Sequence, residues 1–147
     1  MSNAGVVPEL RITLPASRGS LALLRHVMRG FRDAYDVSLA TMEDIVLAVS
    51  EAAANVVVHA YSGRPGTMTI VARVDDAGVL HTLVRDHGCG IVPPSDTPVL
   101  GHGLALMDHV ASSMQIVGSP AGTDVTMSFL LTTEHDWSTL SDFGAAS

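Results

Sequence analysis

Three polar residues recur at four-residue intervals in an otherwise apolar segment, VLAVSEAAANVVVHAY, and they are Glu51, Asn55 and His59. In an α-helix the residues i, i+4 and i+8 lie on one face, so these side chains converge where the apolar pattern predicts core. Burying an amide without a hydrogen-bond partner costs roughly 2–7 kcal/mol, and an unpaired carboxylate costs more. This stripe is therefore either satisfied inside the protein or kept for a ligand.

Glycines and one acidic residue downstream favour a ligand. Asp86 ends a strand-like stretch and is followed by Gly88 and Gly90, so an acceptor stands beside backbone that a flat base can approach closely. Gly101 and Gly103 come directly before a helical run, LALMDHVA. The N–H groups at the start of a helix are a natural seat for phosphate. Together with the polar helix, in this order, these residues indicate a nucleotide site.

Four strings carry a resemblance to a known superfamily. In order, EAAANVVVHAY, DHGCG, GHGLALM and AGTDV resemble the nucleotide-binding motifs of the Bergerat-fold ATPases, which include gyrase, Hsp90, histidine kinases and MutL. Within that superfamily the chain looks most like the bacterial anti-sigma-factor serine/threonine kinases, and the resemblance covers residues 11–131. It implies an α/β two-layer sandwich with a mixed, mostly antiparallel sheet and helices on one face. The ATPase domain is expected over residues 8–132, followed by a flexible tail over residues 133–147.

The resemblance also assigns roles, and side-chain chemistry agrees with them. Asn55 offers an amide oxygen to the Mg²⁺ that accompanies ATP, and Glu51, one turn earlier, is placed to accept the proton of the attacking hydroxyl. Asp86 matches the aspartate that reads the exocyclic amine of adenine, and Thr123 is expected to hold a water beside the same base. The remaining members of the expected nucleotide-binding set are Gly88, Gly90, Gly101, Gly103 and Leu104.

Each of these residues also has a purely structural interpretation, in which it binds no ligand. Glu51 taken alone fits a surface glutamate on a half-buried helix, and Asp86 before two glycines fits the start of a turn. Asn55 is disfavoured in mid-helix by intrinsic propensity, which argues against a purely structural role. His59 is more often a packing or helix-end residue than a ligand, so it is left out of the catalytic set.

Length and composition are those of one globular domain. A chain of 147 residues can bury about two-thirds of its unfolded surface without metal or disulfide staples. The single cysteine, Cys89, cannot form an internal bridge, which fits a reducing compartment. No segment approaches the roughly 18 apolar residues that span a bilayer, and the N-terminus lacks a basic-then-apolar signal pattern. A cytoplasmic location is expected.

The charge distribution bears on partners. A net charge of −7, from 8 basic and 15 acidic residues, argues against direct nucleic-acid binding. Half of the basic residues fall near the N-terminus, at Arg18, Arg25, Arg29 and Arg32. This basic segment is either a solvated helix face or a docking surface for an acidic protein partner.

The candidate residues need a scaffold, and periodicity predicts one. LRITLPA alternates like a first strand, and residues 17–35 have the apolar spacing of an amphipathic helix. A second helix begins at a Ser38 or Thr41 cap and continues to about His59.

Two hairpins and a loop complete the predicted scaffold. TMTIVARVD and GVLHTLVRD flank a turn at residues 76–77, and SMQIVGS and TDVTMSFLL flank another at residues 120–122. Residues 91–100 contain three prolines and no periodic pattern, so an exposed loop is expected there. By position this loop resembles the lid over ATP in the family.

Two classes of function fit these features. The first is an ATP-dependent protein serine/threonine kinase that phosphorylates an anti-anti-sigma protein and sequesters a sigma factor. For it the resemblance implies ATP, Mg²⁺ and these two partners, and suggests a homodimer. The second is a nucleotide-gated module that sequesters a regulatory partner without phosphotransfer. One departure from the family's pattern favours the module without phosphotransfer. Residues 87–110 contain no Lys or Arg, so the lid brings no permanent positive charge to a transferring phosphoryl group.

Overall fold

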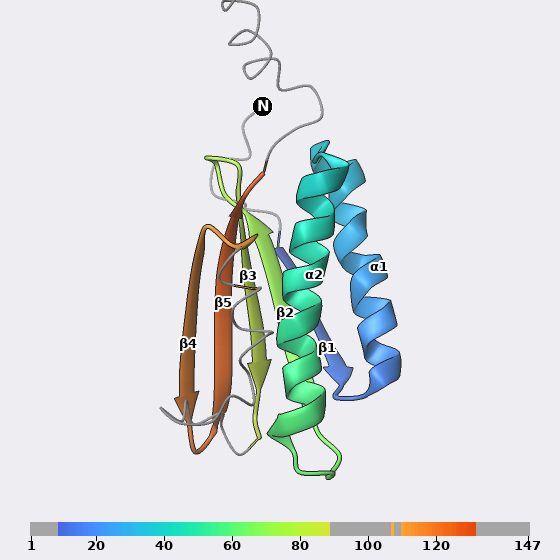
Figure 1. Ribbon diagram of the computed structural model, residues 1–147, viewed down its shortest axis with the longest axis vertical. Coiled ribbons are helices and arrows are strands. Elements are labelled where there is room, and N and C mark those ends of the chain that lie inside the picture. The colour runs from blue at the N-terminus through green and yellow to red at the C-terminus, as the bar shows by residue number, and fades with distance from the viewer. Residues whose placement is uncertain (1–8, 89–106, 108–109, 132–147) are drawn as a thin grey trace, which may run out of the picture.

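A five-stranded antiparallel sheet with two helices on one face makes up the part of the chain that the computed structural model describes, namely residues 9–88, 107 and 110–131. In spatial order the strands are β1 (Glu9–Pro15), β2 (Thr67–Val74), β3 (Val79–Asp86), β5 (Gly122–Leu130) and β4 (Ser113–Ser119). Helices α1 (Arg18–Tyr35) and α2 (Leu39–Asn55) lie side by side against this sheet (Figure 1). The predicted two-layer sandwich is confirmed, and each pairing in the described sheet is antiparallel rather than mixed.

Alternation along β3 decides which residues face the helices. Leu80, Thr82, Val84 and Asp86 are buried, whereas the residues between them are only partly buried. Successive side chains of a strand point to opposite faces. Asp86 therefore belongs to the helix-facing set, and it places a carboxylate at the rim of the core.

Caps fix the ends of both helices. The Ser38 side chain accepts a hydrogen bond from the Thr41 N–H at 3.2 Å, which confirms Ser38 as the cap of α2. Helix α1 follows Ser17 and ends before Asp36, whose φ of 52° is the left-handed geometry typical of a helix C-terminus. The helix predicted over residues 17–35 is thus confirmed.

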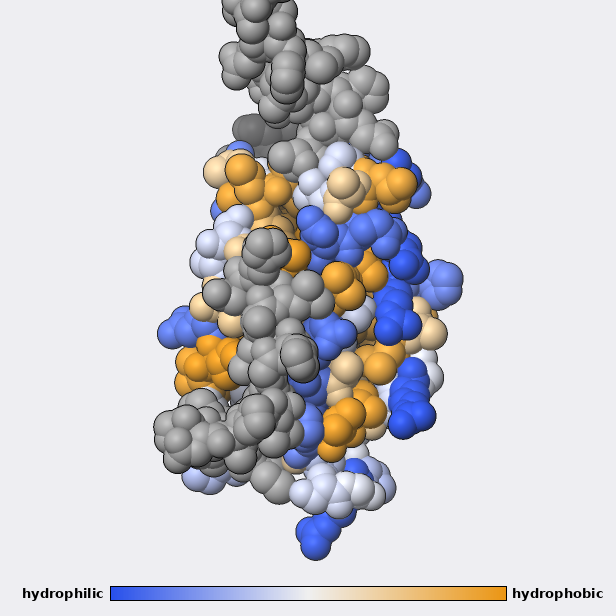
Figure 2. Space-filling view, in the orientation of Figure 1, coloured by the Kyte–Doolittle hydropathy of each residue, from blue (hydrophilic) through white to orange (hydrophobic). Residues whose placement is uncertain are grey.

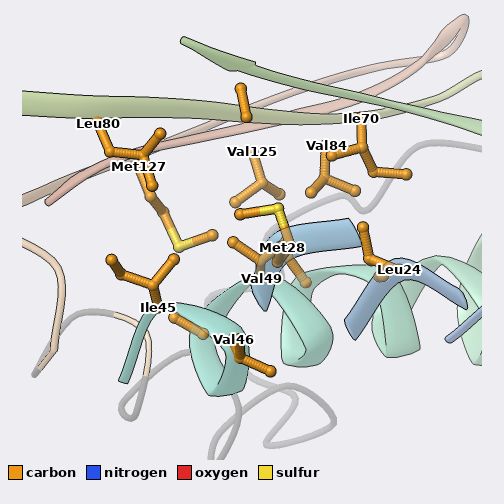
Figure 3. Packing of buried hydrophobic residues seen from close by; sticks show 14 of the residues in the cluster. Leu24, Met28, Ile45, Val46, Val49, Ile70, Leu80, Val84, Val125 and Met127 are labelled. Atoms are coloured by element: carbon orange, nitrogen blue, oxygen red, sulfur yellow. The ribbon is translucent and has the colours of Figure 1, made fainter. Parts of the chain in front are cut away.

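Apolar side chains of the two helices pack against those of the sheet (Figure 3). Met28 of α1 and Ile45 of α2 share one buried cluster with Ile70, Val84 and Met127 of the sheet. Truncating such a residue to alanine typically costs about 2–5 kcal/mol. This core holds α2, which carries the polar stripe, firmly against the centre of the sheet.

Both predicted hairpins are present. Asp75 Oδ1 accepts hydrogen bonds from the N–H groups of Ala77 at 2.9 Å and Val79 at 3.0 Å, and Gly78 has a φ of +78°. An aspartate that bonds its own downstream backbone, followed by a glycine, is a turn signal with a physical basis. The second hairpin joins β4 to β5, with Ser119 opposite Gly122.

Several predictions fall on residues outside the described ranges. These include the loop over residues 91–100, the tail over residues 133–147 and most of the helix predicted at residues 104–111. Of that helix, Met107 and Val110 are helical, and the Ala111 N–H donates to the Met107 carbonyl at 2.9 Å. The domain limits of residues 8–132 stay a prediction. Within the described ranges, none of the helices combines the length and apolarity needed to cross a membrane.

Candidate functional site

Glu51 and Asn55 lie on α2 at the edge of the helix–sheet interface. Both are partly exposed, whereas their neighbours Ala52 and Ala53 are buried. Neither side chain makes a hydrogen bond or ion pair with another described residue. Among the described residues, these two polar side chains one turn apart thus have no hydrogen-bond partner beside a packed core.

Beyond Asn55 the helix changes its geometry. Residues Val56–Ala60 form a π-helical turn, η1, in which i→i+5 hydrogen bonding adds a residue to the turn. His59 lies within this turn, so its place in the stripe with Glu51 and Asn55 stays a prediction. Such turns are frequent at functional sites, and this one directly follows the residue expected to bind Mg²⁺.

Asp86 is the last residue of β3 and is only 2% exposed. Its Oδ1 accepts the N–H of Gly88 at 2.9 Å, so the side chain itself begins a turn, as the structural alternative anticipated. No other described residue donates a hydrogen bond to Oδ2. The turn thus occupies one carboxylate oxygen, and the second has no donor among the described residues.

Thr123 lies directly opposite Asp86 in the β3–β5 register and is also 2% exposed. The preceding residue, Gly122, has a φ of +140°, and a Cβ there would overlap the carbonyl oxygen of Asp86. Only glycine permits both features. The structure therefore places Asp86 and Thr123 side by side, and their shared role at one base stays a prediction.

The two candidate segments meet behind this turn. A Cβ on Gly88 would overlap the carbonyl oxygen of Ala60, the last residue of η1. In Figure 1 the helix α2 and the strand β3 both end at the bottom of the molecule. The helix that carries Asn55 and the strand that ends in Asp86 thus contribute to one region.

Four predicted site residues lie outside the described ranges. They are Gly90, Gly101, Gly103 and Leu104. Their expected role, to present backbone N–H groups to phosphate, stays a prediction.

A groove of about 330 Å³ runs between α1 and α2 and includes Glu51 in its lining. Two of the four arginines of the basic segment, Arg25 and Arg29, line this groove, and Arg29 Nε lies 3.6 Å from Glu43 Oε1. Leu47, also in the lining, is 43% exposed. Figure 2 shows hydrophilic and hydrophobic side chains interspersed over these helices. The α1–α2 groove therefore combines arginines, glutamates that include the candidate base, and apolar surface.

Two further residues of this region were not identified by sequence reasoning. Ser50 lines the α1–α2 groove at 6% exposure, and its Oγ has no hydrogen-bond partner among the described residues. Tyr61 Oη accepts the His87 N–H at 3.0 Å and donates to the Thr67 carbonyl. Ser50 directly precedes the string EAAANVVVHAY and Tyr61 ends it, and this position is the sequence signal that both residues carry.

An ion pair lies on the opposite face of the sheet. Arg85 Nε and Nη2 each donate to a carboxylate oxygen of Asp124 at 2.8 Å. These hydrogen bonds lower the pKa of Asp124 and raise the pKa of Arg85 from their ordinary values. Because the two residues directly adjoin Asp86 and Thr123, the pair helps to fix the β3–β5 register at the candidate site.

Residues 14–129 match the model of the histidine kinase-like ATPase domain. The chain belongs to this family. The match confirms the predicted resemblance and fold class, and the family description makes ATP the expected nucleotide.

Curated relatives carry the names of regulators. The chain is 26% identical over 136 residues to the anti-sigma F factor of Halalkalibacterium halodurans, a match that covers 84% of this chain and 93% of that protein. It is 29% identical over 124 residues to the serine-protein kinase RsbW of Bacillus mycoides, covering 74% of this chain and 77% of that one. The match to the anti-sigma F factor of Geobacillus thermodenitrificans is shorter, with 28% identity over 83 residues and 57% of its length.

Solved structures agree on the fold. The RsbU and RsbW domains of a Mycobacterium tuberculosis protein superpose with a TM-score of 0.69 at 26% identity, over 84% of this chain and 32% of that chain. The histidine kinase domain of a blue-light-activated kinase from Erythrobacter litoralis superposes with a TM-score of 0.57 at 19% identity, over 77% of this chain and 60% of that one. The second similarity concerns the fold alone.

Proposed function

We propose that this protein is an ATP-dependent protein serine/threonine kinase that acts as an anti-sigma regulator. It sequesters a sigma factor and phosphorylates an anti-anti-sigma protein on serine or threonine. The observation that carries the proposal is the contact between Gly88 and Ala60, which brings Asp86 to the same end of the molecule as the helix with Glu51 and Asn55. The names of the relatives, anti-sigma F factor and serine-protein kinase, support this choice of partners.

The base of the nucleotide is assigned to Asp86. A buried carboxylate with one oxygen held by Gly88 presents its other oxygen to a donor such as an exocyclic amine. Thr123, its neighbour across the strands, is placed to orient a water at the same base. This donor and acceptor set fits adenine.

The phosphate end is assigned to α2. Magnesium keeps most of its waters and takes one or two hard oxygen ligands from protein, and the partly exposed amide oxygen of Asn55 suits that requirement. Glu51, one turn earlier, accepts the proton of the attacking hydroxyl, a contribution typically worth 10²–10⁴-fold in rate. Bound ATP supplies the phosphoryl group. The predicted phosphate contacts of Gly90, Gly101, Gly103 and Leu104 complete this assignment.

The α1–α2 groove is assigned to the protein partner, as the second interpretation of the basic segment anticipated. Arg25 and Arg29 line it with cations that an acidic segment can contact in competition with Glu43, and Leu47 offers apolar contact. The buried hydroxyl of Ser50, which lacks a partner among the described residues, is a group that an incoming polar atom can satisfy. Because Glu51 lines the same groove, a bound segment lies beside the candidate base. The homodimer suggested by the resemblance stays a prediction.

The experiment that tests this function is transfer of label from γ-labelled ATP, in the presence of Mg²⁺, to a candidate anti-anti-sigma protein. The wild type is compared with Glu51→Ala and Asn55→Ala. The matched control is Asp44→Asn, which removes an exposed carboxylate from the same helix. Loss of transfer in the first two variants with retention in the control supports the kinase.

The absence of Lys and Arg from residues 87–110 favours the second candidate, a nucleotide-gated module that sequesters its partner without phosphotransfer. Tight ATP binding by the wild type, with no label on any antagonist, is the result that selects it. The relatives' names favour the kinase over this module.

A further inference from the structure

Tyr61 is the first residue after η1, and its ring lies against Gly66. A Cβ added to Gly66 would overlap the ring atoms Cε1, Cδ1 and Cζ. The ring is thereby held over the turn that leads into β2. Its position is set by the backbone of that turn rather than by rotamer preference alone.

The hydroxyl of Tyr61 bridges two strands. It accepts the His87 N–H at 3.0 Å and donates to the Thr67 carbonyl. The β2–β3 register ends with Met68 opposite Asp86, so Thr67 and His87 would form the next pair. The Tyr61 hydroxyl thus stands between an N–H and a carbonyl that would otherwise belong to the same ladder.

This bridge acts on the turn that orients Asp86. The His87 N–H is held by Tyr61, and the next N–H, of Gly88, is held by Asp86 Oδ1 at 2.9 Å. The Gly88 backbone in turn lies against the carbonyl of Ala60. The turn after β3 is therefore tied on one side to the end of the α2–η1 helix and on the other to the Asp86 carboxylate.

We propose that Tyr61 is a positioning residue for recognition of the nucleotide base. Its hydroxyl holds the His87–Gly88 backbone, which keeps Asp86 Oδ1 occupied and aims Oδ2 at the exocyclic amine. Tyr61 directly follows the helical segment that carries Asn55 and Glu51, but its hydroxyl contacts Thr67 and His87. This inference rests on the proposed ATP site and adds a residue that does not itself touch the nucleotide.

The test is the preference for ATP over inosine triphosphate, whose base carries a carbonyl in place of the exocyclic amine. Binding of both nucleotides is measured by calorimetry for the wild type and for Tyr61→Phe, which deletes one oxygen and keeps the ring on Gly66. We expect the ATP preference to fall about tenfold, because a misaligned Asp86 Oδ2 loses its hydrogen bond from the exocyclic amine. One hydrogen bond of typical strength changes an equilibrium constant by about that factor. At saturating ATP, kcat for phosphotransfer should change by less than about twofold, since a uniform binding contribution affects KM rather than kcat.

Tyr35→Phe is the matched control, because this second tyrosine stacks on Phe31 with ring centroids 5.8 Å apart and has no part in the turn. It should leave the preference unchanged. A folded Tyr61→Phe that keeps the wild-type preference overturns the inference.

A merely structural role would weaken both nucleotides equally, and that result also overturns the inference. If circular dichroism shows that Tyr61→Phe does not fold, Gly66→Ala decides, since it keeps the hydroxyl but displaces the ring and should reduce the preference in the same direction. A wild type that binds neither nucleotide would instead refute the proposed function. The two failures are therefore distinguishable.

Discussion

The carbonyl oxygen of Ala60 lies so close to the Cα of Gly88 that no side chain fits between them. Ala60 ends the π-helical turn after Asn55, and Gly88 ends the turn that begins at Asp86. The end of a helix and the end of a strand are thus packed backbone to backbone. This contact joins the two halves of the candidate nucleotide site.

Gly88→Ala should destabilise the protein by about 1–3 kcal/mol, because the added methyl forces backbone to move. Urea unfolding measures the change. Gly30→Ala is the matched control: this glycine lies in α1, a Cβ there meets nothing within 4 Å, and the change should stabilise by up to about 1 kcal/mol. Equal effects of the two substitutions would contradict the close approach at Gly88.

Asp86→Asn should weaken ATP binding roughly 10- to 100-fold while leaving the fold intact, since hydrogen bonds to charged groups contribute about 1.5–3 kcal/mol. The asparagine carbonyl can still accept from the Gly88 N–H, so the turn is expected to persist. Calorimetry measures the affinity and circular dichroism monitors the fold. Unchanged affinity would count heavily against assigning the base to Asp86.

The ion pair between Arg85 and Asp124 should make the free energy of unfolding depend on pH. Because the pKa of Asp124 lies below its ordinary value of 3.8 in the folded state, the stabilisation is fully present above that value and is lost as the pH falls through the folded pKa. Arg85→Gln should therefore cost about 0.5–1 kcal/mol at pH 7, a modest value because both side chains are partly exposed. The difference in free energy of unfolding between wild type and Arg85→Gln should shrink toward zero as the pH falls below 3.8.

The measurement for this pair is urea unfolding of wild type and Arg85→Gln at several pH values. Arg64→Gln is the control, since Arg64 is exposed in a turn and makes no ion pair with another described residue. It should show no such pH dependence. A destabilisation by Arg85→Gln that stays constant down to pH 2 would contradict the assignment of the lowered pKa to this pair.

Charge reversal in the α1–α2 groove should weaken docking of the antagonist. Arg25→Glu and Arg29→Glu are each expected to raise its KM about tenfold or more at low salt, because both line the groove. Arg18→Glu alters net charge equally but does not line the groove. If all three variants lose the same affinity, net charge rather than the groove explains the effect.

Much of the scaffold was predictable because its signals are local. The Ser38 cap, the Asp75 turn and the buried alternation of β3 each depend on residues within a few positions of one another. The motifs of the candidate site were predictable for the same reason. That Asp86 and Thr123 lie opposite each other depends on the antiparallel β3–β5 register, which joins strands far apart in the sequence.

The remaining features depend on contacts that a linear pattern does not encode. Widening of the helix after Asn55 leaves no trace in VVVHA, which suits an α-helix and a π-helical turn equally. Tyr61 bonds residues 6 and 26 positions away, so its role exists only in the folded chain. The α1–α2 groove likewise forms only when two amphipathic helices pack side by side.

If Asp86 and Asn55 belong to one ATP site, an NMR titration with nucleotide should report binding at both residues together. Mg²⁺-ATP is added to ¹⁵N-labelled protein while the side-chain amide of Asn55 and the backbone amides of Gly88 and Thr123 are followed. We expect the resonances of all three amides to shift along one binding isotherm, while those of Gly30 and Gly78 stay unchanged. Shifts confined to other residues, or separate isotherms for Asn55 and Gly88, would contradict a shared site.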